Sequence, residues 1–256
     1  MPIIFLLTIN DDVTRAGQFL YRPALIINET SYFWLNQLWS ILRLANETYV
    51  SLDSLNLLAH QSIERNMQKP FIADKTFKGQ DFSETRLPQG EYENCRFEGC
   101  NFSRGFLDNQ NFMECQFVDC NLSNANIVNT TFKEVEFDLC KMMGLRFETC
   151  NTFLIEFLFS GCDLSYSSFY EMTLNKQKFL NCNLTSTDFS SAQLKEVSFQ
   201  NCNMLNAVFN NTDLEKSDFT SAKNYSIDPE RNKLKKAKFS LNEIKGLLHK
   251  YEITIV

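Results

Sequence analysis

Cysteines are the residues of this chain whose type and spacing could most directly do chemistry. The sequence has nine of them in 256 residues, and some form pairs five residues apart, such as Cys95 with Cys100 and Cys115 with Cys120. Closely spaced thiolates bind zinc or respond to oxidation, whereas a buried free cysteine packs as a small hydrophobic residue. Disulfides belong to oxidising compartments, but the N-terminus lacks a basic region followed by an adequate apolar core.

These cysteines follow a five-residue rhythm that runs through most of the chain. From Phe77 to Phe157 every fifth residue is apolar apart from Thr152, and a second run, shifted by two, extends from Leu154 to Phe219. All nine cysteines lie two positions before one of these fifth residues. Residues two apart in an extended segment point to the same side, so each unit sends one small and one large side chain inward. We therefore interpret the cysteines as structural.

The same geometry predicts reduced thiols. Cysteines on successive coils would point in parallel across about 4.8 Å. That separation exceeds the usual distance between the Cβ atoms of a disulfide, roughly 3.5–4.5 Å. We expect the thiols to stay reduced in a bacterial-type cytoplasm.

A coarser period of 20 residues contains the finer one. Nine phenylalanines mark it, at Phe77, Phe97, Phe117, Phe137, Phe159, Phe179, Phe199, Phe219 and Phe239. Every interval is 20 residues except that from Phe137 to Phe159, which is 22, and we assign the two extra residues to a bulge or corner loop near Glu148 to Thr152. A fixed period indicates a solenoid of stacked coils. Four five-residue units per turn predict a four-sided coil.

The repeating unit resembles the pentapeptide-repeat family, whose units read roughly A-[DN]-[LF]-x-x. The triplets Cys100-Asn101-Phe102 and Cys162-Asp163-Leu164 show the pattern, which extends from about Phe77 to Phe239. The resemblance implies an all-β solenoid, a right-handed quadrilateral β-helix. We assign residues 67–239 to it.

The C-terminal residues 240–256 are expected to cap the last coil with a helix and a short strand. Ser240 and Glu243 form a capping box, an apolar helical face follows, and the tail from Tyr251 to Val256 has the composition of a strand. A helix and strand after the last coil also resemble the Qnr and MfpA members of the family, which form rod-like dimers through their C-terminal ends. The resemblance implies a homodimer, with these candidate dimerisation residues: Leu247, Leu248, Ile253 and Ile255.

Residues 1–66 lack the rhythm and contain no cysteine. Their basic residues are four arginines and no lysine, whereas the chain from Met67 has 16 lysines and five arginines. One interpretation is a helical appendage, because Phe33 to Leu44 and Leu52 to Ile63 contain enough apolar residues for short amphipathic helices. The other is that translation begins at Met67 and that the upstream stretch is an artefact of start-site assignment. The break in composition favours the second.

Catalysis finds little support in the sequence. The two histidines, His60 and His249, lie outside the repeats, and no phosphate-binding loop, zinc-protease motif or nucleophile elbow is present. We therefore expect a protein that is not an enzyme, without a metal or a cofactor. A net charge of −6 argues against direct binding of nucleic acid, which requires a basic face. No stretch is long enough to span a bilayer, so we expect a cytoplasmic protein.

The resemblance to Qnr and MfpA implies a function. Those proteins look like duplex DNA in size and charge, bind type II topoisomerases such as gyrase and protect them from quinolones. The candidate acidic face here consists of four residues: Glu114, Glu134, Glu136 and Glu156. The 20-residue period places Glu114 beside Glu134, and it places Glu136 beside Glu156. Apart from the two-residue insertion, nothing protrudes between Phe77 and Phe219, unlike the loop-bearing Qnr members. The alternative is a scaffold for an unrelated protein partner.

Overall fold

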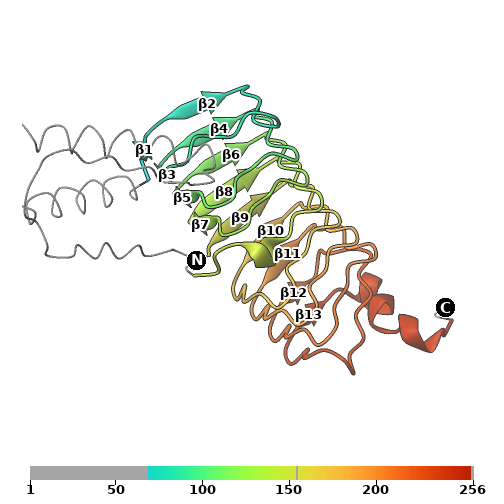
Figure 1. Cartoon of the computed structure of the whole chain (residues 1–256). Coiled ribbons are helices and arrows are strands. Elements are labelled where there is room, and N and C mark those ends of the chain that lie inside the picture. The colour runs from blue at the N-terminus through green and yellow to red at the C-terminus, as the bar shows by residue number, and fades with distance from the viewer. Residues whose placement is uncertain (1–68, 154, 255–256) are drawn as a thin grey trace, which may run out of the picture. The chain divides into compact units, whose positions relative to one another are not determined.

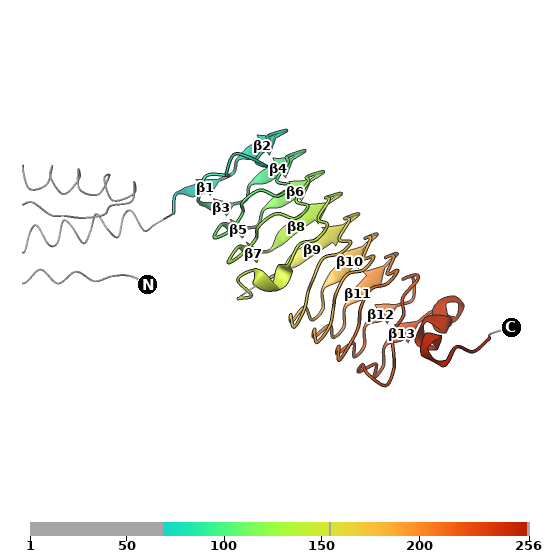
Figure 2. The same cartoon turned by 45° about the vertical axis from the view of Figure 1, so that its right-hand side comes forward.

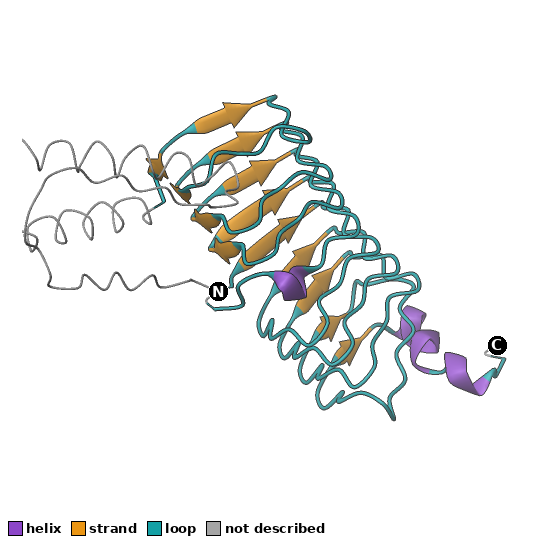
Figure 3. Ribbon diagram, in the orientation of Figure 1, coloured by secondary structure: helices purple, strands orange, loops and turns teal. Residues whose placement is uncertain are grey.

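The computed structural model describes residues 69–153 and 155–254, so the expectations for residues 1–66 fall outside it. The described residues form thirteen short strands and three 3₁₀ helices wound into a rod (Figures 1 and 3). The strands are β1 (Phe71–Ala73), β2 (Thr76–Lys78), β3 (Glu91–Glu93), β4 (Arg96–Glu98), β5 (Asn111–Met113), β6 (Gln116–Val118), β7 (Thr131–Lys133), β8 (Val135–Asp138), β9 (Phe157–Ser160), β10 (Lys178–Leu180), β11 (Ser198–Gln200), β12 (Asp218–Phe219) and β13 (Lys238–Phe239). The helices are η1 (Phe147–Thr149), η2 (Leu241–Leu247) and η3 (His249–Tyr251).

Two parallel sheets run along the rod. One has nine strands in the order β13-β12-β11-β10-β9-β8-β6-β4-β2, and the other has four, β1-β3-β5-β7. Strands of the larger sheet pair at a 20-residue register, as Phe97 does with Phe117, and at 22 residues where Phe137 pairs with Phe159. The predicted phenylalanine ladder and the solenoid are thus confirmed. Isolated parallel bridges, such as Asn101 with Asn121 and Ser168 with Asp188, link the coils on the other sides.

A left-handed residue ends many of the five-residue units, where the chain turns. Non-glycine residues with positive φ recur five residues apart, for example Asn109 at 59°, Glu114 at 52° and Asp119 at 51°. Glycine adopts this conformation freely, and asparagine and aspartate tolerate it better than other residues do. Gly79, at φ 60°, shows the preferred choice. Where the repeat instead places glutamate, the fold carries backbone strain.

Stacked aromatic rings fill the interior. Successive members of the ladder stack face to face, for example Phe97 on Phe117 with centroids 4.7 Å apart and Phe159 on Phe179 at 5.3 Å. Rings from adjacent sides meet edge to face, as Phe97 does with Phe112 at 5.8 Å. Burial of each such side chain contributes about 1.5–3 kcal/mol. The core is therefore one continuous column of packed side chains. Any residue that binds a partner must lie on the outer faces of the rod.

The two-residue insertion falls slightly later than expected. The 20-residue register still holds at Asn151, whose N–H donates to the carbonyl of Thr130. By Val135 and Phe157 the register is 22. The extra residues therefore lie between Asn151 and Phe157, in an exposed loop, whereas we expected them near Glu148 to Thr152. This loop replaces the next strand of the four-stranded sheet, which ends at β7 (Figure 2).

The C-terminal segment covers the last coil, but it differs from the prediction. The N–H of Glu243 donates to Ser240 Oγ at 3.3 Å, as a capping box requires, yet η2 and η3 are 3₁₀ helices. Gly246 packs so closely on Tyr225 that a Cβ there would lie 2.3 Å from the Tyr225 carbonyl oxygen. The short strand expected over Tyr251 to Val256 is not formed in its described part, residues 251–254, because Glu252 turns the chain at φ 48°.

Candidate functional site

The cysteines lie inside the coil, as their spacing predicted. All nine are free and buried. Six of them directly precede the bridging residues of consecutive coils and form one interior ladder: Cys100, Cys120, Cys140, Cys162, Cys182 and Cys202. The Cys140 thiol donates to the carbonyl of Phe117 at 3.3 Å, and Thr130, in the same slot of another side, donates to the Leu107 carbonyl at 2.8 Å. The slot therefore accommodates a small residue, and a thiol or hydroxyl there can donate to the backbone of the preceding coil.

Burial makes the thiol of Cys115 a poor nucleophile. The pKa of Cys115 rises to about 12 because burial disfavours the thiolate. A thiol of this kind stays protonated at neutral pH and lacks the thiolate needed for redox sensing or metal binding. Among residues 69–153 and 155–254, no group of three His, Cys, Asp or Glu residues is arranged to hold a metal ion.

The structure brings three of the four candidate glutamates to one corner of the rod. Glu114 and Glu134 directly follow the paired residues Met113 and Lys133, so they lie on consecutive coils. Glu134 and Glu156 directly precede Val135 and Phe157, which are paired as well. The side chains of Glu114, Glu134 and Glu156 are exposed. We call this row of three glutamates the acidic corner.

Glu136 does not belong to the acidic corner. The 20-residue period predicted that Glu136 and Glu156 would stack, and this is wrong, because the insertion lies between them and pairs Glu136 with Leu158. On its other side, Gln116 Nε2 donates to Glu136 Oε2 at 3.1 Å, and Arg96 donates to Gln116 Oε1 at 2.6 Å. Glu136 therefore belongs to the larger sheet, where Gln116 binds its carboxylate, and not to the acidic corner.

The side of the rod next to the acidic corner carries exposed apolar residues that sequence reasoning missed. Phe71 and Met113 belong to the four-stranded sheet, and Phe153 lies on the coil that follows β7. The three residues are 63%, 38% and 73% exposed, respectively. They line a shallow groove of about 270 Å³ together with Glu91 and Glu93. The signal was present in the sequence, because all three lie at outward positions of the five-residue unit.

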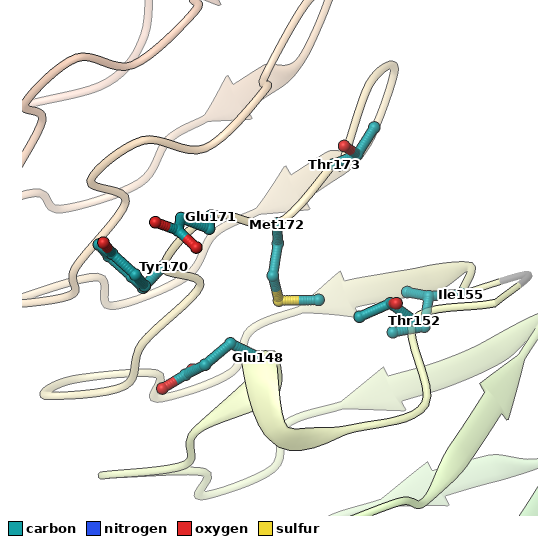
Figure 4. A pocket seen from close by; sticks show the side chains of 7 residues that line it. All are labelled: Glu148, Thr152, Ile155, Tyr170, Glu171, Met172 and Thr173. Carbon is teal, nitrogen blue, oxygen red and sulfur yellow. The ribbon is translucent and has the colours of Figure 1, made fainter.

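A second hollow opens where the insertion departs from the next coil. It has a volume of about 390 Å³ and is lined by Glu148, Thr152, Ile155, Tyr170, Glu171, Met172 and Thr173 (Figure 4). Arg146 Nε donates to Glu148 Oε1 at 3.0 Å, while Glu148 Oε2 is buried without a partner among the described residues. These seven residues include no histidine, cysteine or lysine.

Some of the candidate dimerisation residues pack within their own chain, and others are exposed to solvent. Leu247 packs against the core of its own chain, and Leu248 is half-buried. Ile253 is 57% exposed, and Ile255 lies outside the described residues. Lys250 Nζ forms ion pairs with Asp228 and Glu230 of the preceding coil, each at 2.7 Å.

No helix in the described part of the chain has the length and apolar content needed to cross a membrane.

Comparison with solved structures finds a similar fold in QnrB1. A trypsin-treated variant of QnrB1, a plasmid-mediated fluoroquinolone resistance protein, matches with a TM-score of 0.51 and 20% identity over 74% of this chain and 92% of that one. HetL from Nostoc sp. strain PCC 7120, a pentapeptide repeat protein involved in the regulation of heterocyst differentiation, gives a TM-score of 0.42 and 18% identity over 72% and 93%. At these identities the likeness shows the fold alone. No curated protein sequence matches significantly.

Family models cover most of the solenoid. The model of pentapeptide repeats in eight copies matches residues 93–133 and 111–151, and that of the pentapeptide repeat region matches residues 154–219 and 173–248. The boundary between the two falls in the insertion, where the register of the coil shifts by two residues. The five-residue unit, the four-sided coil and these matches together show that the chain belongs to the pentapeptide-repeat family.

Proposed function

We propose that this chain is a non-catalytic, rod-shaped protein that binds a type II topoisomerase such as gyrase as a DNA mimic and protects it from quinolones. The acidic corner carries the proposal, because Glu114, Glu134 and Glu156 follow one another on consecutive coils. These exposed carboxylates form a row of negative charge along the rod, and this row supports a role in binding a basic surface. The QnrB1-like fold supports the proposal at the level of architecture.

The mimicry is local. One strand of duplex DNA carries a charge about every 3.4 Å of axis, and the acidic corner has one about every 4.8 Å. Over the whole rod the comparison fails, because residues 67–219 have 21 acidic and 13 basic residues, whereas duplex DNA has roughly 22 charges over the roughly 38 Å of eight coil steps. Beyond Glu156 the corner continues with Lys176. The topoisomerase would therefore contact the N-terminal coils of the rod.

The setting and assembly of the protein belong to the same proposal. We infer that it acts in the bacterial cytoplasm as a homodimer joined through its C-terminal ends. Exposed Leu241 and Ile253, 85% and 57% accessible, supply apolar surface for that interface. Its net charge of −6 directs it toward a protein partner and away from direct contact with nucleic acid.

Gyrase supercoiling with and without ciprofloxacin tests the proposal. The wild-type protein at micromolar concentration should alter supercoiling or restore it in the presence of the drug. A variant in which Glu114, Glu134 and Glu156 are all glutamine should lose most of this effect at unchanged thermal stability. The proposal fails if the wild-type protein neither inhibits nor protects the enzyme.

The second candidate function is a scaffold for an unrelated protein. The exposed apolar residues Phe71, Met113 and Phe153 favour it, because contiguous apolar surface marks protein-binding sites and DNA mimicry by itself needs only charge. Pull-down with purified gyrase separates the two candidates. A protein that folds and leaves gyrase unbound would retain only the scaffold function.

A further inference from the structure

We propose that two copies of this protein associate side by side and antiparallel through one corner of the rod. This corner continues the acidic corner past the insertion, and we call it the mixed-charge row. Its six members lie just before strands β8 to β13 on consecutive coils: Glu134, Glu156, Lys176, Glu196, Lys216 and Lys236. The inference goes beyond the proposed function, because it needs only the charges of this row and their register.

The six residues follow one another in a single register. Each lies two positions before a residue of the nine-stranded sheet, and these strand residues pair in one unbroken ladder: Glu136, Leu158, Lys178, Ser198, Asp218 and Lys238. Figure 1 shows strands β8 to β13 stacked in that order. Coils repeat about every 4.8 Å, and all six members of the row are exposed. The row is therefore a line of evenly spaced, accessible charges.

The order of these charges is self-complementary. From Glu134 to Lys236 the signs are minus, minus, plus, minus, plus and plus. Reversing the row and inverting every sign gives the same order, as a two-fold axis between the coils of Lys176 and Glu196 requires. An antiparallel second copy then brings opposite charges together at every step: Glu134 with Lys236, Glu156 with Lys216, and Lys176 with Glu196. Like charges do not meet anywhere along the row.

Other arrangements are disfavoured by the same charges. A slide of one coil places either Glu156 opposite Glu196 or Lys176 opposite Lys216, together with one residue opposite its own equivalent. A parallel second copy in register places every residue opposite its own equivalent. Repulsion between like charges discriminates against these alternatives, so the order of charges selects both the direction and the register of the pair.

The charges of the row are available to a second copy. Among residues 69–153 and 155–254, Glu156, Lys176 and Lys236 take part in no ion pair. Lys216 Nζ lies 2.9 Å from Glu196 Oε1, yet these two side chains are still 50% and 42% exposed. The row can therefore form ion pairs between copies without breaking its contacts within one chain.

The flank of the row on the nine-stranded sheet favours the same arrangement. There Glu136 would lie opposite Lys238 of the second copy, and no like charges of the paired ladder would face each other. On the other flank Lys133 would lie opposite Lys235, which is repulsive. The two copies should therefore meet through the row and the nine-stranded sheet.

Zero-length cross-linking tests the pair on the full-length protein. A carbodiimide joins a carboxylate to an amine that touches it. Glu134 and Lys236 lie five coils apart in one chain, about 24 Å, so a link between them requires two copies. A dimer joined only through its C-terminal ends would not form this link, because Glu134 lies too far from that end.

The link should depend strongly on salt. Exposed ion pairs are individually weak and are screened by salt, so the Glu134–Lys236 link should form at about 20 mM salt and fall at least tenfold at about 300 mM. The link between Lys216 and Glu196, 2.9 Å apart in one chain, is the positive control. If the control link forms at low salt and the Glu134–Lys236 link does not, the proposal is overturned.

Exchange of charges locates the contact. One variant combines Lys216→Glu with Lys236→Glu, and the other combines Glu134→Lys with Glu156→Lys. The row already carries both residue types at these positions, so neither variant makes a new demand on the backbone. Each variant alone faces its own like charges and should lose the cross-linked dimer. An equimolar mixture restores opposite charges at every step and should give at least tenfold more cross-linked dimer than either variant alone.

Two controls separate the row from general charge effects. The Glu134→Lys/Glu156→Lys variant has a net charge of −2, that is −6 + 4, so general repulsion alone would let this variant associate with itself most readily. Self-association of this variant as strong as that of the mixture would overturn the proposal. Glu84→Lys changes an exposed residue of an earlier coil and should leave the wild-type cross-link unchanged.

Gyrase distinguishes this inference from the proposed function, since the two share Glu134 and Glu156. The Lys216→Glu/Lys236→Glu variant keeps the acidic corner and loses the pairing, so under the proposed function its effect on gyrase should equal or exceed that of the wild type. A Glu134–Lys236 link in a protein that has no effect on gyrase would keep the pair and reject the topoisomerase. An effect on gyrase without that link would reject the pair and keep the topoisomerase.

Discussion

Replacement of Glu134 should separate backbone strain from charge repulsion at the acidic corner. Glu134 has φ 54°, in the left-handed region, where an ordinary L-residue costs about 1–2 kcal/mol and asparagine less. Its exposed neighbours on the two adjacent coils are Glu114 and Glu156. Two distinct effects therefore act against this residue in the folded state.

The charge terms nearly cancel. Taking the carboxylates about 6 Å apart, each neighbour repels Glu134 by about 0.7 kcal/mol in water, or about 0.4 kcal/mol after screening at 0.1 M salt. Lys133 Nζ lies 3.9 Å from the carboxylate, which returns about 0.7 kcal/mol on the same basis. The net repulsion is only about 0.1 kcal/mol, so backbone strain dominates.

Two variants give the measurement. Glu134→Gln removes the charge and keeps the strain, so its free energy of unfolding should change by less than about 0.3 kcal/mol. Glu134→Asn relieves the strain as well and should stabilise the protein by about 1 kcal/mol, raising the melting temperature by about 2–4 °C. Urea unfolding at 0.1 M salt measures both. Equal stabilisation by the two variants, or destabilisation by asparagine, would refute this reasoning.

Three further outcomes follow from the described contacts. Gly246→Ala places a Cβ 2.3 Å from the Tyr225 carbonyl oxygen, so it should displace the C-terminal cap and cost about 2 kcal/mol, seen as a melting temperature lower by about 4–8 °C; an unchanged melting temperature would show that the cap is not packed as described. Burial raises the pKa of Cys115 to about 12, so the unfolded chain loses this proton at a lower pH than the folded chain does. The free energy of unfolding should therefore be constant below about pH 8.5 and fall by up to about 1.4 kcal/mol per pH unit above it. Urea unfolding of Cys115→Ala should show a smaller slope, and an unchanged slope would contradict the role of this thiol. Removal of residues 252–256 should convert a dimer into a monomer by light scattering, and a monomeric wild-type chain would contradict the C-terminal interface.

The solenoid could be predicted from the sequence because every coil repeats the same pattern of inward and outward side chains. A large inward residue at every fifth position is a local requirement, and the ladder from Phe77 to Phe239 meets it at every coil, usually with a small residue two positions earlier. The buried place of Cys140 and its neighbours followed from the same rule. Periodicity therefore predicts what is inside the coil.

Positions outside the period were harder to predict. The pairing of Glu136 depended on which side of it two extra residues fell, and composition near Glu148 did not distinguish the alternatives. The groove was missed because Phe71, Met113 and Phe153 do not share a single sequence interval and become neighbours only when the coils stack. The C-terminal strand failed because an apolar tail also suits a turn that exposes Ile253.

Competition between this protein and duplex DNA for gyrase tests the central claim most directly. Labelled duplex bound to gyrase is followed by anisotropy as unlabelled protein is added. A DNA mimic that acts through the acidic corner should displace the duplex, and the variant with glutamine at Glu114, Glu134 and Glu156 should need at least tenfold more protein to do so. Duplex that stays bound at saturating protein, or equal displacement by both proteins, would contradict the account.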